Sequence, residues 1–511
     1  MAGPFGVALA AALAVPILLP GAIVPAEQHV LVVLALFLFW PIHYLLAKRR
    51  SAAGTVAERP IALPVTLKAL LLWLPINLLV AGMSLLAWSS AGYLLLGVAL
   101  YSYCLRHPWL RHHPERLAFA LVALGGALLL AIPFIEWKSA FRLFYVPLYD
   151  WFSGSILDIG ETIHANVLAG ALVTLLPLVA ALALPLHYPR PRLKKVNPNP
   201  GAEVKVLQLH IQRRRPYGRI VATGLVIFMA TLLLLTQSRG AYLATATALG
   251  LLGVLRWRRL FALLPIFAIG VGITIYQLGW SRIFDLLGSD NTFGGAGFRT
   301  VIWHADQRAL HDFFWTGIGL GRFTEVMRLL YPSPIIQSPS ATHAHNLLLQ
   351  IGLDLGGPGL LAWLGLYLTL IGMTIAVLRR TASPTGSAES LDATWDGTQF
   401  IAPPHVDVTI STRRFVRRLT KVERRRQQQW LLAAGCLAAL VGIQIHGLLD
   451  AVTWGNKLAF IPWLLFALVT LLYDSTSPST AQSPVTSDKQ SHPLHPKYGD
   501  LHTPIDPTMN P

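Results

Sequence analysis

Long apolar runs recur along almost the whole chain, separated by shorter polar stretches. Runs of about 20 apolar residues are long enough to cross the hydrocarbon core of a bilayer as helices. The pattern predicts about twelve such spans, at residues 4–24, 29–47, 62–86, 89–105, 117–135, 162–187, 219–236, 240–255, 260–279, 356–378, 430–449 and 458–473. The third and fourth spans divide near Trp88-Ser89-Ser90. We therefore expect an all-α polytopic membrane protein.

Composition agrees with this fold class. The chain is 54% hydrophobic and 13% charged, with a mean hydropathy of +0.54, which excludes an ordinary soluble domain of this length. The first apolar run lacks a basic region before it, so we expect a retained helix and not a cleaved signal peptide. The two cysteines, Cys104 and Cys436, fall in apolar segments and imply no disulfide framework.

The net charge is +17, and the Lys and Arg residues that produce it gather in alternate loops. This distribution indicates how the chain is oriented in the membrane. Loops after even-numbered spans are rich in Lys and Arg and are therefore expected in the cytoplasm, together with both termini. Two basic cytoplasmic insertions are expected, at 188–218 and 381–429, followed by a disordered cytoplasmic tail at 474–511. A large, helical outer loop is expected at 281–343, between the ninth and tenth spans.

Two arginines on the outer side are candidates for binding phosphate. Arg239 lies in a tight turn between two apolar spans, and Arg299 lies in the outer loop. A guanidinium offers forked donors that match the geometry of a phosphate. The alternatives are that Arg239 is an interfacial side chain that reaches the lipid headgroups, and that Arg299 forms a salt bridge with Asp306.

His345 is the candidate general base, at the entrance to a predicted span. Asn346 could cap that helix, and the amide end of the helix would keep the imidazole neutral. The nearby His343 is the rival for this role. The run Gly356-Gly357-Pro358-Gly359 then predicts a break or kink in the helix.

A metal site is the other use that the histidines suggest. His304, His343 and His345 have acidic residues near them in the sequence, namely Asp306 and Asp312. None of these has the spacing of a known pair of metal ligands. The sequence therefore favours chemistry without a metal or other cofactor.

Five short motifs resemble those of the O-antigen ligase and polymerase superfamily, and they occur in the family's order between about residues 160 and 460. They are Ile163 to Gly170, Thr236 to Ala241, Phe298 to Trp303 with Gly317 to Phe323, His345-Asn346 with Gly356 to Gly359, and His446 to Asp450. The resemblance implies a helical membrane glycosyltransferase of about twelve spans that inverts the anomeric carbon without a metal.

The resemblance also implies a donor, an acceptor and residue roles. Members of this superfamily move a glycan from undecaprenyl diphosphate to an acceptor hydroxyl at the outer face of the bacterial cytoplasmic membrane. On this chain, Arg239 and Arg299 would bind the diphosphate, with Arg322 as an auxiliary candidate, and His345 would deprotonate the acceptor. Lipid A-core is the favoured acceptor, and no nucleic acid is expected as a partner.

Several alternatives remain open from the sequence. Within the superfamily, the enzyme could be a polysaccharide polymerase or a protein O-oligosaccharyltransferase, or it could be a member that has lost activity. From another class, a transporter or flippase for a lipid-linked glycan would also need many spans and basic residues facing phosphate. A transporter predicts polar groups near the middle of the bilayer and not a cluster at one face.

Overall fold

The computed structural model describes a large part of the chain. The described residues are 30–35, 64–128, 132, 135–136, 163–185, 187–199, 202–213, 217–262, 265, 269–270, 272–279, 296–382 and 408–477. The span predicted at 4–24, most of that at 29–47 and almost all of the predicted tail lie outside them. The chain divides into two units, Met1–Thr476 and Ser477–Pro511, and the first contains all the described helices and strands.

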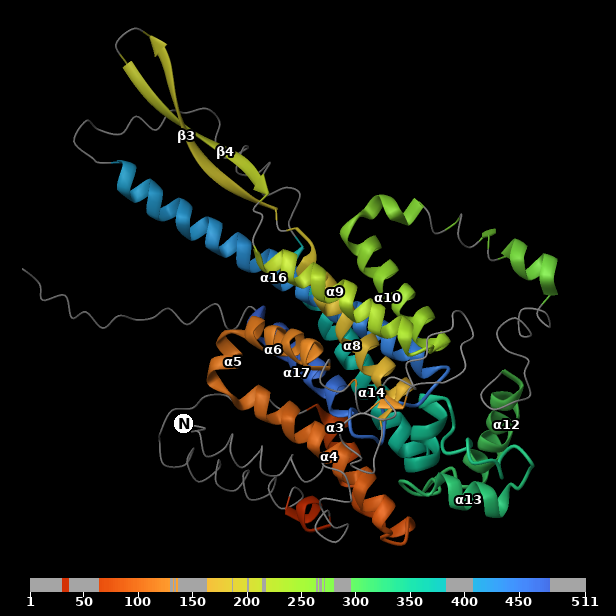
Figure 1. The fold of residues 1–511 in the computed structure, drawn as a ribbon. Coiled ribbons are helices and arrows are strands. Elements are labelled where there is room, and N and C mark those ends of the chain that lie inside the picture. The colour runs from red at the N-terminus through yellow and green to blue at the C-terminus, as the bar shows by residue number, and fades with distance from the viewer. Residues whose placement is uncertain are drawn as a thin grey trace, which may run out of the picture. The chain divides into compact units, whose positions relative to one another are not determined.

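Helices make up most of the described chain (Figure 1). They are α3 (Val65–Val80), α4 (Leu85–Arg106), α5 (Pro108–His112), α6 (Pro114–Ala127), α8 (Ala165–Ala183), α9 (Tyr217–Leu235), α10 (Arg239–Arg256), the 3-10 helix η2 (Arg258–Ala262), α12 (Ala296–Asp312), α13 (Phe323–Leu330), α14 (Leu347–Thr381), α16 (Val408–Gly447) and α17 (Phe460–Ser475). Two short strands, β1 (Ile135–Glu136) and β2 (Ile163–His164), pair in parallel.

Five of the described helices are long and apolar enough to cross a membrane. They are α4, α8, α14 and parts of α9 and α16, at Gly218–Leu235 and Lys421–Gly447. The helices α3 and α17 are apolar but shorter. The chain is therefore an integral membrane protein with a mainly helical fold, and the count of twelve spans stays a prediction.

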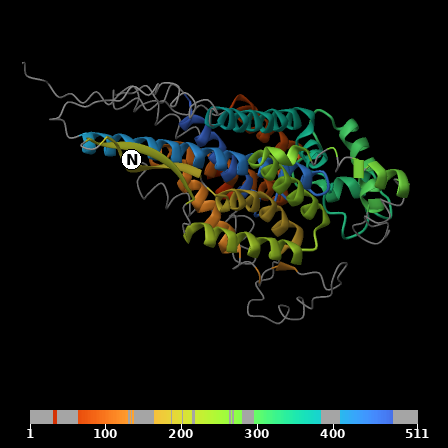
Figure 2. The same cartoon turned by 90° about the horizontal axis from the view of Figure 1, so that it is seen from above.

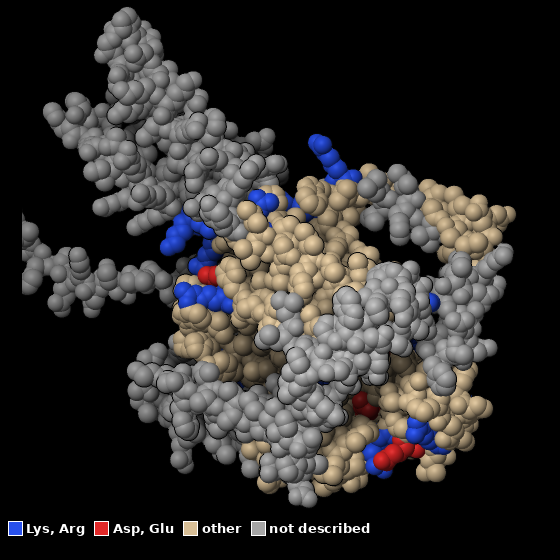
Figure 3. Space-filling model, in the orientation of Figure 1, with Lys and Arg blue, Asp and Glu red and all other residues tan. Residues whose placement is uncertain are grey.

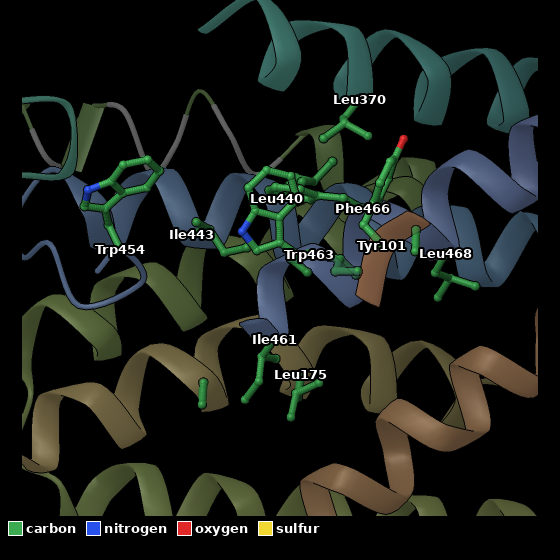
Figure 4. Packing of buried hydrophobic residues seen from close by; sticks show 14 of the residues in the cluster. Tyr101, Leu175, Leu370, Leu440, Ile443, Trp454, Ile461, Trp463, Phe466 and Leu468 are labelled. Carbon is green, nitrogen blue, oxygen red and sulfur yellow. The ribbon is translucent and has the colours of Figure 1, made fainter. Parts of the chain in front are cut away.

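The core of the fold lies where α16 packs against α8, α10 and α14 (Figure 2). Small side chains of α16, including Ala433, Ala434, Ala438 and Ala439, are fully buried there. In a membrane, small residues let helix backbones approach closely, and the resulting van der Waals contact drives association. Aromatic residues fill the wider space between α4, α14 and α17, among them Tyr101, Trp463 and Phe466 (Figure 4).

The boundary between α3 and α4 differs from the prediction. The chain turns at Ala81–Ser84 and not near Trp88-Ser89-Ser90, which lies within α4. Gly82 and Met83 both adopt positive φ, of 63° and 52°, and the hydroxyl of Ser84 accepts the backbone N–H of Ala87 as an N-cap. The turn is set by these backbone conformations, because the apolar pattern alone runs across it unbroken.

Both predicted cytoplasmic insertions contain regular structure. Strands β3 (His187–Asn199) and β4 (Ala202–Arg213) form an antiparallel hairpin within the first. In the second, α16 begins at Val408, well before the predicted span at 430–449. Its first part is rich in Arg and ends in three consecutive Gln residues, which are good helix formers, so the helix continues beyond the apolar segment.

The two ends of the helical bundle differ in charge. At one end, Arg219 donates to the backbone carbonyl of Ala183 and Arg256 donates to that of Pro185. Arg380 donates to the carbonyl of Tyr473 at the same end. Figure 3 shows much of the blue Lys and Arg surface gathered over this part of the molecule. The opposite end holds the starts of α8, α10 and α14 and the last turn of α16.

The predicted break in the Gly356 region is confirmed. Gly356 has φ 72° and ψ −179° within α14, so the helix is interrupted there. Segment 314–317 fills the interruption, because the backbone N–H of Gly357 donates to Phe314 at 2.6 Å and that of Ile318 donates to Leu353 at 2.7 Å. The break therefore joins the segment after α12 to the start of a membrane helix.

Replacing Gly356 by alanine is expected to lower stability by roughly 2–4 kcal/mol, because strain and overpacking add. A Cβ at this position would lie 2.7 Å from the carbonyl oxygen of Trp315, in a backbone conformation that alanine rarely adopts. Heating in detergent followed by size-exclusion chromatography measures the change. Gly372→Ala is the matched control, since nothing lies near a Cβ there; equal melting of the two variants would contradict the expectation.

Candidate active site

His345 lies in the turn that precedes α14. The side chain of Asn346 accepts the backbone N–H groups of Leu348 and Leu349 at 3.0 and 3.1 Å, which confirms its predicted role as N-cap. His345 has φ 49°, a left-handed conformation that is unusual for a residue other than glycine. Its side chain is only 12% exposed, and the charged group beside its ring is Asp450.

Asp450 brings a carboxylate to the same place, three residues after the end of α16. It is 3% exposed. Its Oδ1 lies 3.6 Å from Nε2 of His343 and 3.8 Å from Nδ1 of His345. Its Oδ2 accepts a hydrogen bond of 2.7 Å from the side-chain amide of Asn166, at the start of α8. The site is therefore assembled from the ends of α8, α14 and α16.

The protonation of His343 follows from its contacts. Nδ1 of His343 accepts the backbone N–H of His345 at 3.0 Å. In a neutral imidazole the nitrogen that accepts a hydrogen bond carries no proton, so the proton of His343 is on Nε2. Nε2 therefore presents an N–H toward Asp450. The ring of His345 lies 3.9 Å from that of His343, centroid to centroid.

These three side chains are close enough together to suggest a metal site. His343, His345 and Asp450 each place one ligand atom within 4.8 Å of the others. The atom of His343 that would bind the ion is Nε2, which carries the proton and so has no lone pair to offer. The arrangement fits a histidine and carboxylate pair better than a set of metal ligands. Chemistry without a metal stays our prediction.

Burial sets the charge states of this cluster. Burial is the main cause that lowers the pKa of His345 to about 3, and the charge of His343 lowers it further. Asp450 and the Ser340 backbone act to raise this pKa, but their effects are smaller. Burial also lowers the pKa of His343. Both imidazoles are therefore neutral near pH 7. We expected a neutral His345 from the helix terminus, but burial is the larger cause.

Asp450 is ionised at neutral pH although it is buried. Burial acts to raise its pKa, but the surrounding positive charges outweigh burial and lower it below the usual value. These charges come from His343, His345, His446 and Arg299. The histidines are neutral near pH 7. The permanent positive charge of Arg299 is therefore the charge that still favours the ionised form of Asp450 at that pH. An anionic Asp450 beside neutral imidazoles can stabilise a proton that arrives on either ring.

The structure relates the three predicted arginines to this cluster in different ways. Arg299 is half-buried on α12, and its charge influences Asp450 and both histidines. Arg239 begins α10, and a Cβ on the adjoining Gly240 would lie 3.4 Å from the ring of His446. Arg322 instead forms an ion pair with Glu325 at the start of α13. Diphosphate binding by these arginines stays a prediction.

The possible salt bridge between Arg299 and Asp306 is not formed. Asp306 is fully buried on α12, and neither of its oxygens has a hydrogen-bond partner in the described part of the chain. Burial raises the pKa of Asp306 to about 8. The carboxyl group is therefore largely protonated at pH 7, and it forms no ion pair with Arg299.

We expect the stability of the protein to fall between about pH 4 and pH 8 through Asp306. The folded state keeps a proton that the unfolded state releases above its ordinary pKa of 3.8, so stability is highest below that value and is lost as pH rises to about 8. When melting temperatures are measured at pH 5, 6, 7 and 8, the decline with rising pH should be smaller in Asp306→Asn than in wild type. Asp312→Asn, at an exposed carboxylate of the same helix, is the control; parallel curves for wild type and Asp306→Asn would refute the assignment.

Two polar residues of the site occur within the sequence motifs but were not predicted to act. Asn166 and Asp450 both adjoin long apolar segments, and each is far from His345 in the sequence. The signal that could have found them is an amide and a carboxylate at the ends of two apolar helices. Only packing of α8 and α14 against α16 brings them to the histidines.

One comparison with known protein families gives a match. Residues 224–364 match the family model described as O-antigen ligase. The matched segment contains Arg239, Arg299, His345 and the break at Gly356. No curated protein matches the chain. The match to the family model confirms, over residues 224–364, the resemblance to the O-antigen ligase superfamily that was read from the motifs.

Proposed function

We propose that this protein is an O-antigen ligase-like glycosyltransferase. It moves a glycan from undecaprenyl diphosphate to a hydroxyl of an acceptor, for which lipid A-core is the favoured choice. The reaction inverts the anomeric carbon and uses no metal. The observation that carries this proposal is the mostly buried, neutral His345 ring beside the ionised Asp450 and in the field of Arg299.

In this proposal His345 is the general base. Its neutral imidazole takes the proton of the acceptor hydroxyl while the acceptor oxygen attacks the anomeric carbon of the donor. The new bond forms between that carbon and the acceptor oxygen, and the bond to the phosphate oxygen breaks. Attack from the side opposite to the leaving group gives inversion, and the proton later passes from His345 to water.

The arginines act on the leaving group. Undecaprenyl diphosphate gains negative charge as the bond to the sugar breaks, and fixed guanidinium groups stabilise a charge that develops in the transition state. Arg299 and Arg239 are the proposed donors, with Arg322 as an auxiliary candidate. The lipid diphosphate remains at the membrane interface, so no soluble nucleotide is needed.

Asp450 is proposed to support the base. Once His345 holds a proton it becomes an imidazolium, and the carboxylate 3.8 Å from its Nδ1 stabilises that charge. The amide of Asn166 fixes the other carboxylate oxygen, which keeps Asp450 in place. His343 is less suited to be the base, because its Nδ1 already accepts a backbone N–H and its Nε2 carries a proton.

We place the site at the outer face of the bacterial cytoplasmic membrane, with both termini in the cytoplasm. The separation of the basic helix ends from the histidine cluster supports this orientation. The cluster lies at helix ends, whereas a transporter would be expected to hold such groups near the middle of the bilayer. Polymerase and protein O-oligosaccharyltransferase activities remain alternatives, because they share this chemistry and differ in acceptor.

Purified wild-type protein tests the function directly. It is incubated in detergent and EDTA with an undecaprenyl-diphosphate glycan and one acceptor from each class, namely lipid A-core, a second lipid-linked glycan and a protein. A product with lipid A-core supports the ligase, and a product with another acceptor selects one of the alternatives. Failure with all three, together with movement of the donor across the bilayer of reconstituted vesicles, would favour the transporter.

A further inference from the structure

The peptide group that joins Ala344 to His345 is held on both sides. Its carbonyl oxygen accepts a hydrogen bond of 3.0 Å from the indole N–H of Trp303 on α12. Its N–H donates to Nδ1 of His343 at 3.0 Å. Ala344 itself is fully buried. The plane of this peptide is therefore fixed by two side chains from different parts of the site.

The preceding peptide group is fixed as well. The backbone N–H of Ala344 donates to Oε1 of Gln350 at 2.8 Å. The amide of Gln350 is oriented by Asp354, whose Oδ1 accepts its Nε2 at 3.0 Å, while Oδ2 accepts the indole of Trp454 at 2.8 Å. Gln350 therefore presents an oxygen, and not an NH₂ group, to the turn that carries His345.

A turn held this firmly explains the conformation of His345. A non-glycine residue in the left-handed region costs roughly 1–3 kcal/mol and persists where its surroundings determine it. With the peptide plane fixed on its N-terminal side, the φ of 49° sets where the imidazole lies. The ring then meets Phe298 edge to face, with 5.7 Å between centroids, in addition to His343.

We propose that Trp303 and Gln350 are positioning residues, which hold the Ala344 backbone and thereby aim the His345 ring. The inference rests on the proposed role of His345 as the base. Trp303 lies four residues after Arg299, so both share one face of α12. The same helix thus carries the arginine proposed to bind the diphosphate and orients the base, so that the group that activates the acceptor and the group that stabilises the leaving diphosphate are aligned by one element.

The first test is kinetic and uses Trp303→Phe, which keeps an aromatic ring but loses the N–H. We expect kcat to fall about tenfold to a hundredfold, since a small misplacement of a catalytic group has effects of this size. The KM for the donor should change less than about twofold, because Arg299 is untouched. Trp315→Phe is the matched control, on the exposed indole that follows α12.

The Gln350→Met variant and the double variant Trp303→Phe with Gln350→Met show whether Trp303 and Gln350 act through the same turn. If they do, the combined loss in kcat is smaller than the product of the single losses. Replacing Trp303 by benzothienylalanine, in which sulfur takes the place of the indole N–H, keeps the shape in case Trp303→Phe folds poorly. A kcat for either Trp303 substitution equal to that of Trp315→Phe would overturn the proposal.

The second test does not depend on activity. Diethyl pyrocarbonate modifies accessible neutral imidazoles, and mass spectrometry of the His345 peptide follows its rate. Release of the turn in Trp303→Phe should raise the modification rate of His345 at least about threefold, while Trp315→Phe stays at the wild-type rate. Equal rates in all three proteins would overturn the positioning role, whereas an inactive wild type with a raised rate in Trp303→Phe would count against the proposed transferase alone.

Discussion

Replacing His345 by alanine is expected to lower the turnover of glycan transfer by about 10²- to 10⁴-fold, which is the usual contribution of a general base. The acceptor hydroxyl would then have to lose its proton to water in a site from which the ring has been removed. Purified variant and wild type are compared with saturating donor and acceptor. The KM for the donor should change little, because the arginines remain.

Two further variants make this result interpretable. His304→Ala removes an exposed histidine of α12 and should match wild type. His343→Ala should reduce turnover less than His345→Ala, because His343 holds the turn but has no free lone pair for the acceptor proton. Wild-type turnover in His345→Ala, with a large loss in His343→Ala, would move the role of base to His343.

Replacing Arg299 by glutamine is expected to lower kcat/KM by about 10²- to 10³-fold, as removal of one group that stabilises a developing charge does elsewhere. The loss should appear in kcat as well as in KM, because the leaving diphosphate carries more charge in the transition state than in the bound donor. Initial rates over a range of donor concentrations separate the two. Arg299→Lys keeps the charge but loses the forked donors, and should recover only part of the rate.

The control for Arg299 is another arginine on the same helix. Arg308 is exposed, and its charge acts on Asp312 and not on the histidine cluster. Arg308→Gln should therefore retain wild-type kcat/KM. If Arg299→Gln and Arg308→Gln behave alike, Arg299 does not bind the diphosphate, and Arg239 becomes the principal candidate.

Periodicity and local signals predicted much of the fold that positions the site. The spans that correspond to α8, α9 and α10 were placed within a few residues, and the cap at Asn346 and the break at Gly356 were both found from the sequence. These features are local, since a cap or a break depends on a few neighbouring residues. They can therefore be read without knowledge of tertiary contacts.

Other features depend on contacts or conformations that no short pattern contains. The turn at Gly82 and Met83 interrupts an apolar run with no change in polarity. Asp450 can be recognised as a site residue only from the tertiary structure, in which the end of α16 lies beside the turn of His343. The hydrogen bond from Trp303 to Ala344 joins α12 to the turn before α14. Motifs could therefore indicate which residue types are candidates for catalysis, but not which side chains surround them.

The direction of the helices has a practical consequence. The proposed chemistry uses the first residues of α8, α10 and α14 and the residues just after α16. The two basic insertions follow the other ends of α8 and α14, between α8 and α9 and between α14 and α16. Added chain at those junctions is a full helix length from the histidines. Affinity tags or fluorescent proteins for purification and imaging are therefore best inserted there, where they leave the catalytic geometry untouched.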